Sequence, residues 1–220
     1  MLPEKWDPLY RKILEEFGYD EPSDNNSARL LKALMINSEL VFDEEVSIQR
    51  TATVFGNSDS LEEDIKKMPP AGTLIASGSS VGVLSELGIV PDIIVTDLDG
   101  EIQPQIETSK KGKLTFIHAH GDNTDLIQKY AQEFTGPVIL TTQSKPDNLI
   151  SNYGGFTDGD RAVCIARHFG AMDIQLLGFD FERPSVKDGS DPVIKAKKLR
   201  WAEKIIFDHN GPDIIIKMPR

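Results

Sequence analysis

Several features that mark common classes of protein are scarce in this sequence of 220 residues. Cys164 is the single cysteine, which excludes an internal disulfide, and its apolar neighbours predict a buried packing residue. No apolar run reaches the roughly 18 residues of a membrane span, and the charged start is unlike a signal peptide. With 24 basic against 35 acidic side chains, the net charge of −11 disfavours nucleic-acid binding. We therefore expect a cytoplasmic protein that binds neither membranes nor nucleic acids.

Short β-branched runs separated by helical patterns predict the architecture. We expect six or seven strands near Thr51–Phe55, Thr73–Ala76, Asp92–Thr96, Leu114–Ala119, Pro137–Thr142, Asp173–Leu177 and Asp213–Lys217. Several of these runs are nearly continuous in apolar residues, such as Ile93-Ile94-Val95, as in strands that are covered on both faces. Strands that alternate with helices favour right-handed crossovers and a mostly parallel sheet. The predicted fold class is α/β, a mostly parallel sheet flanked by helices, with an N-terminal helical extension.

The first 48 residues follow a different pattern. Apolar residues from Trp6 to Phe17 recur at helical spacing before Gly18, and a second helix is expected to begin near Ser23 or Asp24. We interpret 1–48 as a helical extension and 49–220 as an α/β nucleotide-binding catalytic domain. The aromatic residues of the extension either pack on the main domain or form a contact in a homodimer.

Polar residues at the strand ends are the candidate site, because ligands of parallel sheets bind beyond the carboxyl ends of the strands. Asp97 and Asp99 follow the third predicted strand, and strand alternation predicts that both point to the same side. Two such carboxylates need a cation, and Mg²⁺ that also binds substrate phosphates fits them. The other interpretation is a simple turn at Asp99 and Gly100.

The next strand ends in a second polar cluster. In one interpretation Asp122 and Asp125 join the first pair around a metal, and Asn123 or Thr124 caps the following helix. In the other, three residues of this cluster reproduce the HxHxD spacing of zinc hydrolases: His118, His120 and Asp122. Zinc is the weaker alternative, because Asn123 stands where that motif usually has a further histidine. The two histidines are otherwise structural or contact the substrate.

Glycine-rich and serine-rich loops offer backbone N–H groups to an anion. The candidates for phosphate binding in two of them are Gly56, Asn57, Ser58, Ser77, Gly78 and Ser79. Neither loop matches a P-loop or a dinucleotide-binding motif. A third loop leads into an apolar helix and contains Gly155, Phe156, Thr157, Asp158, Asp160 and Arg161. Its plainer interpretation is a capping box between Thr157 and Asp160.

A lysine-rich stretch near the C-terminus includes Lys195 and Lys198 and predicts an amphipathic helix. The lysines form a solvated face, or one or two of them reach the triphosphate of a nucleotide.

The order of these motifs is similar to the nucleotide-binding domain of thiamin pyrophosphokinases. The matching segments are Leu74–Gly78, Leu87–Asp92, Val95–Gly100 and Asp122–Asp125. The sequence resembles the archaeal 6-hydroxymethyl-7,8-dihydropterin pyrophosphokinase family more closely, through Pro91–Gly100, Gly155–Ala162, Leu177–Phe181 and Lys198–Ala202. The thiamin enzymes usually carry Asp-Gly-Gly where this chain has Ser77-Gly78-Ser79, and the short, mostly helical stretch after Arg161 leaves no room for their C-terminal β-sandwich.

This resemblance implies transfer of diphosphate from ATP to the hydroxymethyl oxygen of the pterin, with release of AMP. It also implies Mg²⁺ ligands and catalytic groups at Asp97, Asp99 and Asp125, with Asp122 nearby and Thr124 beside the phosphates. The glycine-rich loop before Arg161 would line the substrate or phosphate pocket. Because one fold supports several activities, three alternatives stay open. They are a metal-dependent sugar-nucleotide transferase, a non-catalytic nucleotide-binding module and a thiamin pyrophosphokinase.

Overall fold

The computed structural model describes residues 1, 3–183 and 191–219. Within these residues, seven parallel strands form one sheet in the order β5-β4-β3-β2-β1-β6-β7. The strands are β1 (Thr51–Phe55), β2 (Thr73–Ser77), β3 (Ile93–Thr96), β4 (Leu114–Ala119), β5 (Val138–Thr142), β6 (Asp173–Leu177) and β7 (Ile215–Lys217). The predicted α/β class, the parallel sheet and the N-terminal helices are confirmed.

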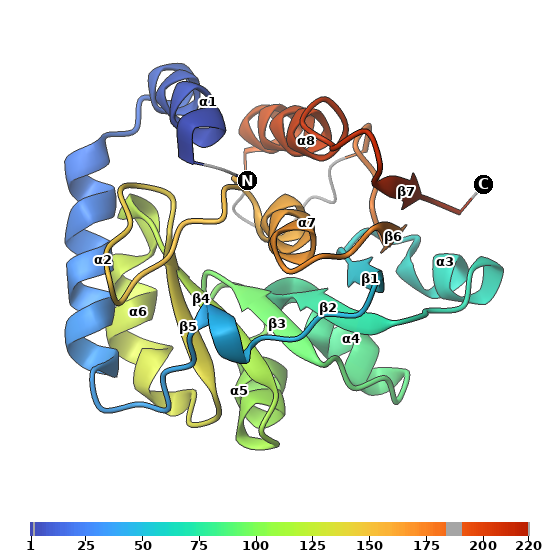
Figure 1. The fold of residues 1–220 in the computed structure, drawn as a ribbon, viewed down its shortest axis with the longest axis horizontal. Coiled ribbons are helices and arrows are strands. Elements are labelled where there is room, and N and C mark those ends of the chain that lie inside the picture. The colour runs from blue at the N-terminus through green and yellow to red at the C-terminus, as the bar shows by residue number, and fades with distance from the viewer. Residues whose placement is uncertain (2, 184–190, 220) are drawn as a thin grey trace.

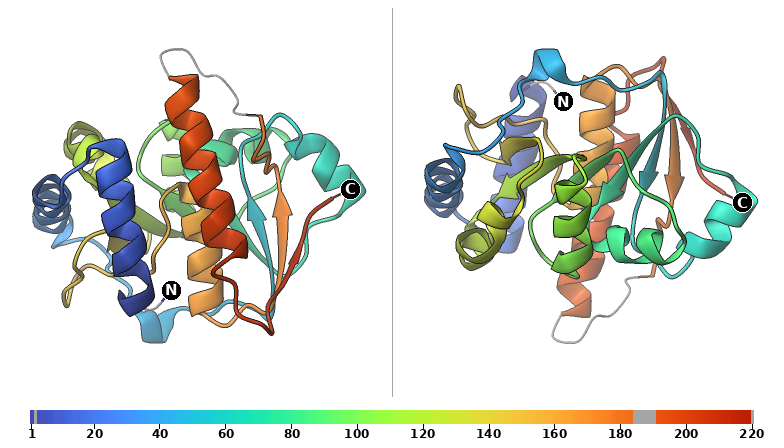
Figure 2. Two further views of the ribbon diagram at one scale, coloured as in Figure 1. Left: turned by 90° about the horizontal axis from the view of Figure 1, so that it is seen from above. Right: turned by 90° about the horizontal axis from the view of Figure 1, so that it is seen from below.

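Helices cover both faces of this sheet, with α7 and α8 on one side and α4 and α5 on the other (Figures 1 and 2). The α-helices are α1 (Pro3–Phe17), α2 (Glu21–Met35), α3 (Leu61–Lys67), α4 (Val81–Glu86), α5 (Ile102–Lys110), α6 (Thr124–Tyr130), α7 (Asp158–His168) and α8 (Pro192–Phe207). None of the helices in the described residues is long and apolar enough to cross a membrane.

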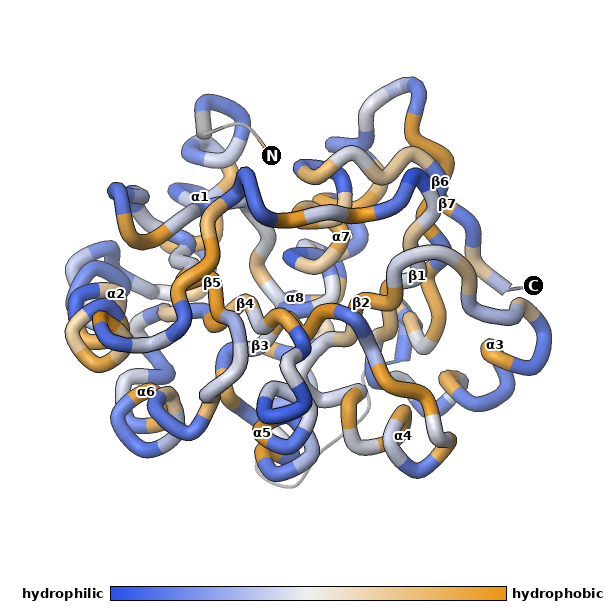
Figure 3. Tube along the Cα trace, turned by 60° about the horizontal axis from the view of Figure 1, so that its bottom comes forward, coloured by the Kyte–Doolittle hydropathy of each residue, from blue (hydrophilic) through white to orange (hydrophobic). Residues whose placement is uncertain are grey.

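Alternating side chains of the strands fill two cores. Val54 and Ile75 pack on the face that α7 covers, whereas Phe55 and Ala76 pack on the opposite face with α3 and α4. The strands at the centre of the sheet are therefore apolar, and polar residues lie on the outer helices (Figure 3). This double coverage leaves the carboxyl ends of the strands as the place where polar groups of neighbouring strands meet.

The N-terminal helices pack on their own chain. Trp6 and Tyr10 of α1 lie in a buried cluster with Cys164 of α7 and Ile205 of α8. These two aromatic side chains therefore pack on the main domain, as one of the two alternatives expects, and the homodimer stays a prediction.

The second helix begins at Glu21, a little earlier than predicted, because Asp20 accepts a hydrogen bond from Ser23 N and caps the helix.

Candidate active site

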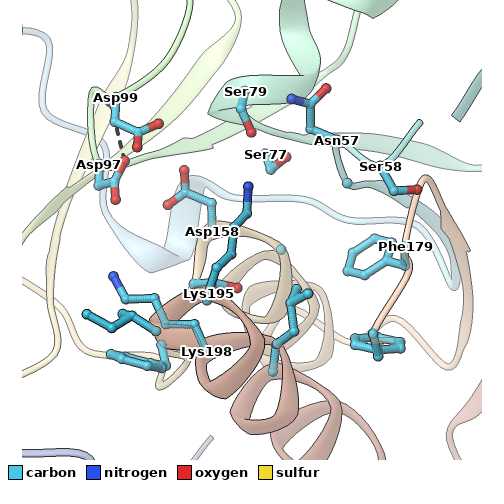
Figure 4. A pocket seen from close by; sticks show the side chains of 18 of the residues that line it. Asn57, Ser58, Ser77, Ser79, Asp97, Asp99, Asp158, Phe179, Lys195 and Lys198 are labelled. Carbon is cyan, nitrogen blue, oxygen red and sulfur yellow. Dashed lines mark hydrogen bonds between the residues drawn. The ribbon is translucent and has the colours of Figure 1, made fainter. Parts of the chain in front are cut away.

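A cavity of about 470 Å³ lies at the carboxyl edge of the sheet. Residues at the ends of neighbouring strands line it in the order Gln143 (β5), His120 and Asp122 (β4), Asp97 and Asp99 (β3), Ser77 and Ser79 (β2), Asn57 and Ser58 (β1), and Phe179 (β6). From the other side the start of α7 contributes Asp158, and α8 contributes Lys195 and Lys198 (Figure 4). The cavity is thus a trough across the strand ends, with carboxylates and lysines near its middle.

The two aspartates after β3 lie on a turn rather than on a continuing strand. The strand ends at Thr96, and Leu98 has a φ of 70°, which is the left-handed region that side chains other than glycine rarely adopt. Leu98 is buried against Ile117, while Asp99 N donates to Asp97 Oδ1 at 3.3 Å. Both carboxylates line the cavity, but this turn places them there, and not the alternation of side chains along a strand.

A buried side chain holds this turn in place. Gln105 of α5 is inaccessible to solvent, and its Nε2 donates to Asp99 O at 2.9 Å and to Glu101 O at 3.2 Å. Its Oε1 accepts from Thr96 Oγ1 at 2.6 Å, and Thr96 Oγ1 in turn accepts from Leu98 N at 2.9 Å. Such bracing is what allows a strained backbone conformation to persist at a functional site.

Asn123 ties the ends of β3 and β4 together. Its Nδ2 donates to Asp97 O at 2.8 Å and to His118 O at 2.7 Å, and its Oδ1 accepts from His120 N at 3.0 Å. Asn123 stands at the N-cap position of α6, as predicted, but its side chain makes no capping hydrogen bond to this helix. Thr124 does not cap the helix either, since its Oγ1 lies 2.6 Å from Ser27 Oγ on α2.

His120 contacts Asp97 directly. Asp122 N donates to His120 Nδ1 at 3.3 Å, so in the neutral ring the hydrogen is on Nε2, which donates to Asp97 Oδ2 at 3.3 Å. Burial alone would raise the pKa of Asp97, but His120, with the charge of Arg161, holds that pKa below its ordinary value. Asp97 is therefore an anionic group turned into the cavity.

The pKa of Asp158, at the start of α7, is shifted in the opposite direction to that of Asp97. Burial and the negative charge of Asp97 raise its pKa well above the ordinary value, against the opposing charge of Arg161, whose Nη1 donates to Asp158 Oδ1 at 2.8 Å. Asp99 adds to this effect. Three carboxyl groups thus crowd one region of the cavity, which favours a bound cation there.

The loop before α7 forms the predicted capping box. Asp160 accepts hydrogen bonds from Phe156 N and Thr157 N, each at 2.7 Å. Arg161 is buried beneath this loop and donates to Phe156 O at 3.3 Å. Asp160 and Arg161 therefore shape the loop from within rather than lining the cavity.

The structure divides the candidate residues into two groups. Those that line the cavity are Asp97, Asp99, Asp122, Gly56, Asn57, Ser58, Ser77, Ser79, His120, Phe156, Thr157 and Asp158. Those outside its lining are Asp125, Gly78, Thr124, His118, Gly155, Asp160 and Arg161. Asp125 is exposed on α6, whereas His118 is buried, with Nδ1 lying 3.0 Å from Thr141 Oγ1.

Four of the lining residues that the sequence misses or leaves undecided are Gln143, Lys195, Phe179 and Tyr19. Gln143 directly follows a predicted strand, so the rule of strand ends could have found it. The sequence leaves Lys195 open between a solvated lysine face and a contact with a triphosphate, and it gives Phe179 only as part of a family motif; both line the cavity. Tyr19 carried no signal, because it lies in the connection between α1 and α2.

Fold and cavity together define a parallel α/β protein with a candidate ligand site at the strand ends, lined by carboxylates and lysines. The chain belongs to the 6-hydroxymethylpterin diphosphokinase MptE-like family, whose family model matches residues 25–185. Three curated relatives bear the name 6-hydroxymethyl-7,8-dihydropterin pyrophosphokinase. That of Pyrococcus furiosus is 39% identical over 97% of each chain, and that of Methanothermobacter thermautotrophicus is 35% identical over 94% of this chain and 95% of its own. That of Methanocaldococcus jannaschii is 33% identical over 92% and 93%. The protein is thus an enzyme of the pyrophosphokinase class.

Proposed function

We propose that this protein transfers diphosphate from ATP to the hydroxymethyl oxygen of 6-hydroxymethyl-7,8-dihydropterin and releases AMP. The relatives that carry this activity in their names match the chain over nearly its whole length. The observation that carries the proposal is the order of groups along the cavity, in which Asp97 and Asp99 lie between two ends and face Lys195 across it (Figure 4).

The β1 and β6 end of the cavity suits the nucleotide. Strands β2 to β5 follow β1 in sequence on one side of it, whereas β6 and β7 lie on its other side. The direction in which strands are added to the sheet therefore reverses between β1 and β6. Ligands of open parallel sheets bind at such a reversal. Gly56 and Gly178 meet there so closely that a Cβ on Gly56 would lie 2.4 Å from Gly178 O. Asn57 and Phe179 directly follow these two glycines and line the cavity, where the amide can hydrogen-bond to a purine base and the ring can stack on it.

The donor set at the middle of the cavity fits magnesium. In the described parts of the chain, no three His, Cys, Asp or Glu side chains are grouped to hold a metal by themselves. Magnesium usually takes only one or two carboxylates and completes its shell with water and substrate phosphates. Asp97 and Asp99 would hold it, beside Asp158, whose pKa is raised by burial and by the charge of Asp97. When bound, the ion neutralises charge on the phosphates.

The chain's own cations complete the phosphate region. Lys195 and Lys198 line the cavity from α8, opposite the carboxylates. The N-terminus of α7 presents main-chain N–H groups beside Asp158, and a helix N-terminus favours an anion. These groups hold the triphosphate between α8 and the strand ends.

In the proposed reaction the acceptor oxygen attacks the β-phosphorus in line with the bond to the α-phosphate. A new P–O bond forms, the bond between the β-phosphorus and the bridging oxygen breaks, AMP leaves with that electron pair, and the hydroxyl proton passes to water. Positioning and charge neutralisation supply most of the rate in such a transfer. Asp97, Asp99 and Lys195 are the residues assigned to these two tasks.

The test incubates the purified protein with ATP, Mg²⁺ and the pterin, with thiamin in a parallel reaction and a third reaction lacking acceptor. Nucleotides are separated by chromatography, and the acceptor product is weighed by mass spectrometry. We expect AMP and a pterin whose mass has increased by that of a diphosphate group. The reaction with thiamin and the reaction without acceptor should give no AMP. ADP in place of AMP, or AMP with thiamin alone, would contradict the proposal.

A further inference from the structure

One end of the cavity lies against the N-terminal helices. Tyr19, from the connection between α1 and α2, lines the cavity with Asp122 and Gln143. Because β4 and β5 lie on the opposite side of β3 from β1 and β6, this end is remote from Asn57 and Phe179. The carboxylates after β3 therefore separate two distinct ends of one cavity.

Tyr19 is fixed in place by the ends of both helices. Gly18 has a φ of 67°, and Tyr19 N donates to Leu14 O at 3.0 Å, which together close α1 in a Schellman motif. The Tyr19 ring stacks on Phe17 with centroids 5.6 Å apart, and Phe17 contacts Phe156 at 5.0 Å. Since Phe156 also lines the cavity, this end has a preformed aromatic wall.

A buried carboxylate of α2 organises the polar part of the same end. Asp24 is 2% exposed and accepts from Tyr10 Oη at 2.6 Å, Gln143 Nε2 at 2.9 Å and Gly121 N at 2.7 Å. Because a carboxylate can only accept, the contact with Gln143 fixes its amide so that Oε1 is directed away from Asp24. The contact with Gly121 fixes the loop that carries Asp122.

The two ends therefore differ in hydrogen-bonding character. The end at the N-terminal helices offers acceptors, the Asp122 carboxylate and Gln143 Oε1, beside the Tyr19 hydroxyl, whose pKa burial and Asp122 raise to about 12. It matches a flat ring with adjacent N–H donors. The other end offers the Asn57 amide, which has one donor side and one acceptor side and so matches adenine.

We propose that the N-terminal helices build the acceptor subsite, in which Asp122 and Gln143 accept the N–H donors of the aminopyrimidinone edge of the pterin against the wall of Tyr19 and Phe156. This assignment rests on the proposed function. The hydroxymethyl group is at the opposite end of the bicyclic ring from that edge, so anchoring the edge here directs the reacting oxygen toward Asp97 and Asp99. Asp24 is a positioning residue for both acceptor groups.

The experiment compares Asp122→Asn and Tyr19→Ala with Asn57→Ala in steady-state assays that vary each substrate. We expect the first two variants to raise the KM for the pterin about tenfold or more, because Asp122→Asn loses a hydrogen bond to a charged group and Tyr19→Ala loses the aromatic wall. The KM for ATP should change less than about twofold. Asn57→Ala has the reverse effect. Glu15→Gln, on the exposed side of α1, is the matched control and keeps both values. A rise in the KM for ATP in the first two variants, or no change in the KM for the pterin, would overturn the proposal.

Direct titration of the pterin against each protein, without ATP, separates this subsite from the reaction. Weaker pterin binding by Asp122→Asn and Tyr19→Ala than by Glu15→Gln supports the subsite even if the wild type forms no AMP, in which case the proposed reaction alone is wrong. Equal pterin binding by the wild type, Asp122→Asn, Tyr19→Ala and Glu15→Gln, with AMP formed by the wild type, keeps the reaction and removes the subsite.

Discussion

His120 Nε2 lies 3.3 Å from Asp97 Oδ2, and the main-chain N–H of Asp122 orients the ring for this contact from the other side. The imidazole therefore holds one oxygen of a carboxylate that is assigned to magnesium. Removing such an orienting partner typically weakens metal binding or activity about 10- to 100-fold. We predict that His120→Ala raises the Mg²⁺ concentration needed for half-maximal AMP formation about tenfold. His168→Ala, which removes a histidine paired with Asp43 outside the cavity, is the control, and an equal Mg²⁺ requirement in both variants would contradict the assignment.

Asp97→Asn and Asp99→Asn each remove one anionic ligand while keeping the size of the side chain. We expect turnover to fall about a hundredfold or more, because the loss of a metal ligand costs several kcal/mol in the transition state. Circular dichroism and the unfolding midpoint should stay close to those of the wild type. If either variant keeps more than about a tenth of the rate, the metal assignment is wrong.

Lys195→Gln tests the cation on α8. We expect the KM for ATP to rise about tenfold and the variant's rate to depend less on ionic strength, because a charged contact to the phosphates is lost. Lys197 is on the same helix, 3.8 Å from Glu16 and outside the cavity lining, so Lys197→Gln is the matched control. Equal effects of the two changes would show that general charge, and not position, is responsible.

Gly178→Ala and Gly88→Ala separate backbone strain from a clash. Both glycines have a left-handed φ, 73° and 71°, but a Cβ on Gly178 would lie 2.6 Å from Gly56 O, whereas a Cβ on Gly88 would meet nothing within 4 Å. Gly88→Ala should lower the free energy of unfolding by about 1 kcal/mol. Gly178→Ala should cost about 1 to 3 kcal/mol more and also raise the KM for ATP, which denaturant titration and kinetics measure. Equal costs for both would mean that the loops after β1 and β6 separate easily.

His118 makes the stability depend on pH. Burial lowers its pKa well below the ordinary value of 6.5, with the charge of Arg161 acting in the same direction, so the unfolded chain binds a proton that the folded chain does not. The free energy of unfolding should therefore fall as the pH drops below about 6.5, by up to about 1.4 kcal/mol per pH unit from this group. His118→Asn, whose amide can replace Nδ1 beside Thr141, should show a smaller loss between pH 7 and pH 5. Parallel curves for the two proteins would refute this account.

Most strands were predictable because the strands of a buried parallel sheet are short runs rich in β-branched residues. The bounds of β1, β4 and β6 equal the predicted ones, Thr51–Phe55, Leu114–Ala119 and Asp173–Leu177. The capping box of α7 was also predictable, because it depends only on Thr157 and Asp160, which are three residues apart in the sequence.

The details of the site were harder to predict because they depend on contacts between distant segments. Asn123 looks like a helix cap in sequence, but its partners are Asp97 O and His118 O, which only the pairing of β3 with β4 brings near. The left-handed Leu98 depends on Gln105, and the place of Tyr19 depends on how the N-terminal helices dock. The division of the chain into 1–48 and 49–220 stays a prediction, although α2 takes part in the site through Asp24.

The place of β1 inside the sheet has a consequence for synthesis. This strand pairs with β2 on one side and with β6 on the other, and the residues of β6 follow it by more than a hundred positions. Until Asp173–Leu177 has left the ribosome, one edge of an apolar strand has no partner, and unpaired edges of this kind recruit other chains. Nascent or truncated chains that end before β6 should therefore aggregate, and the completed protein escapes this hazard only when its sixth strand closes the gap.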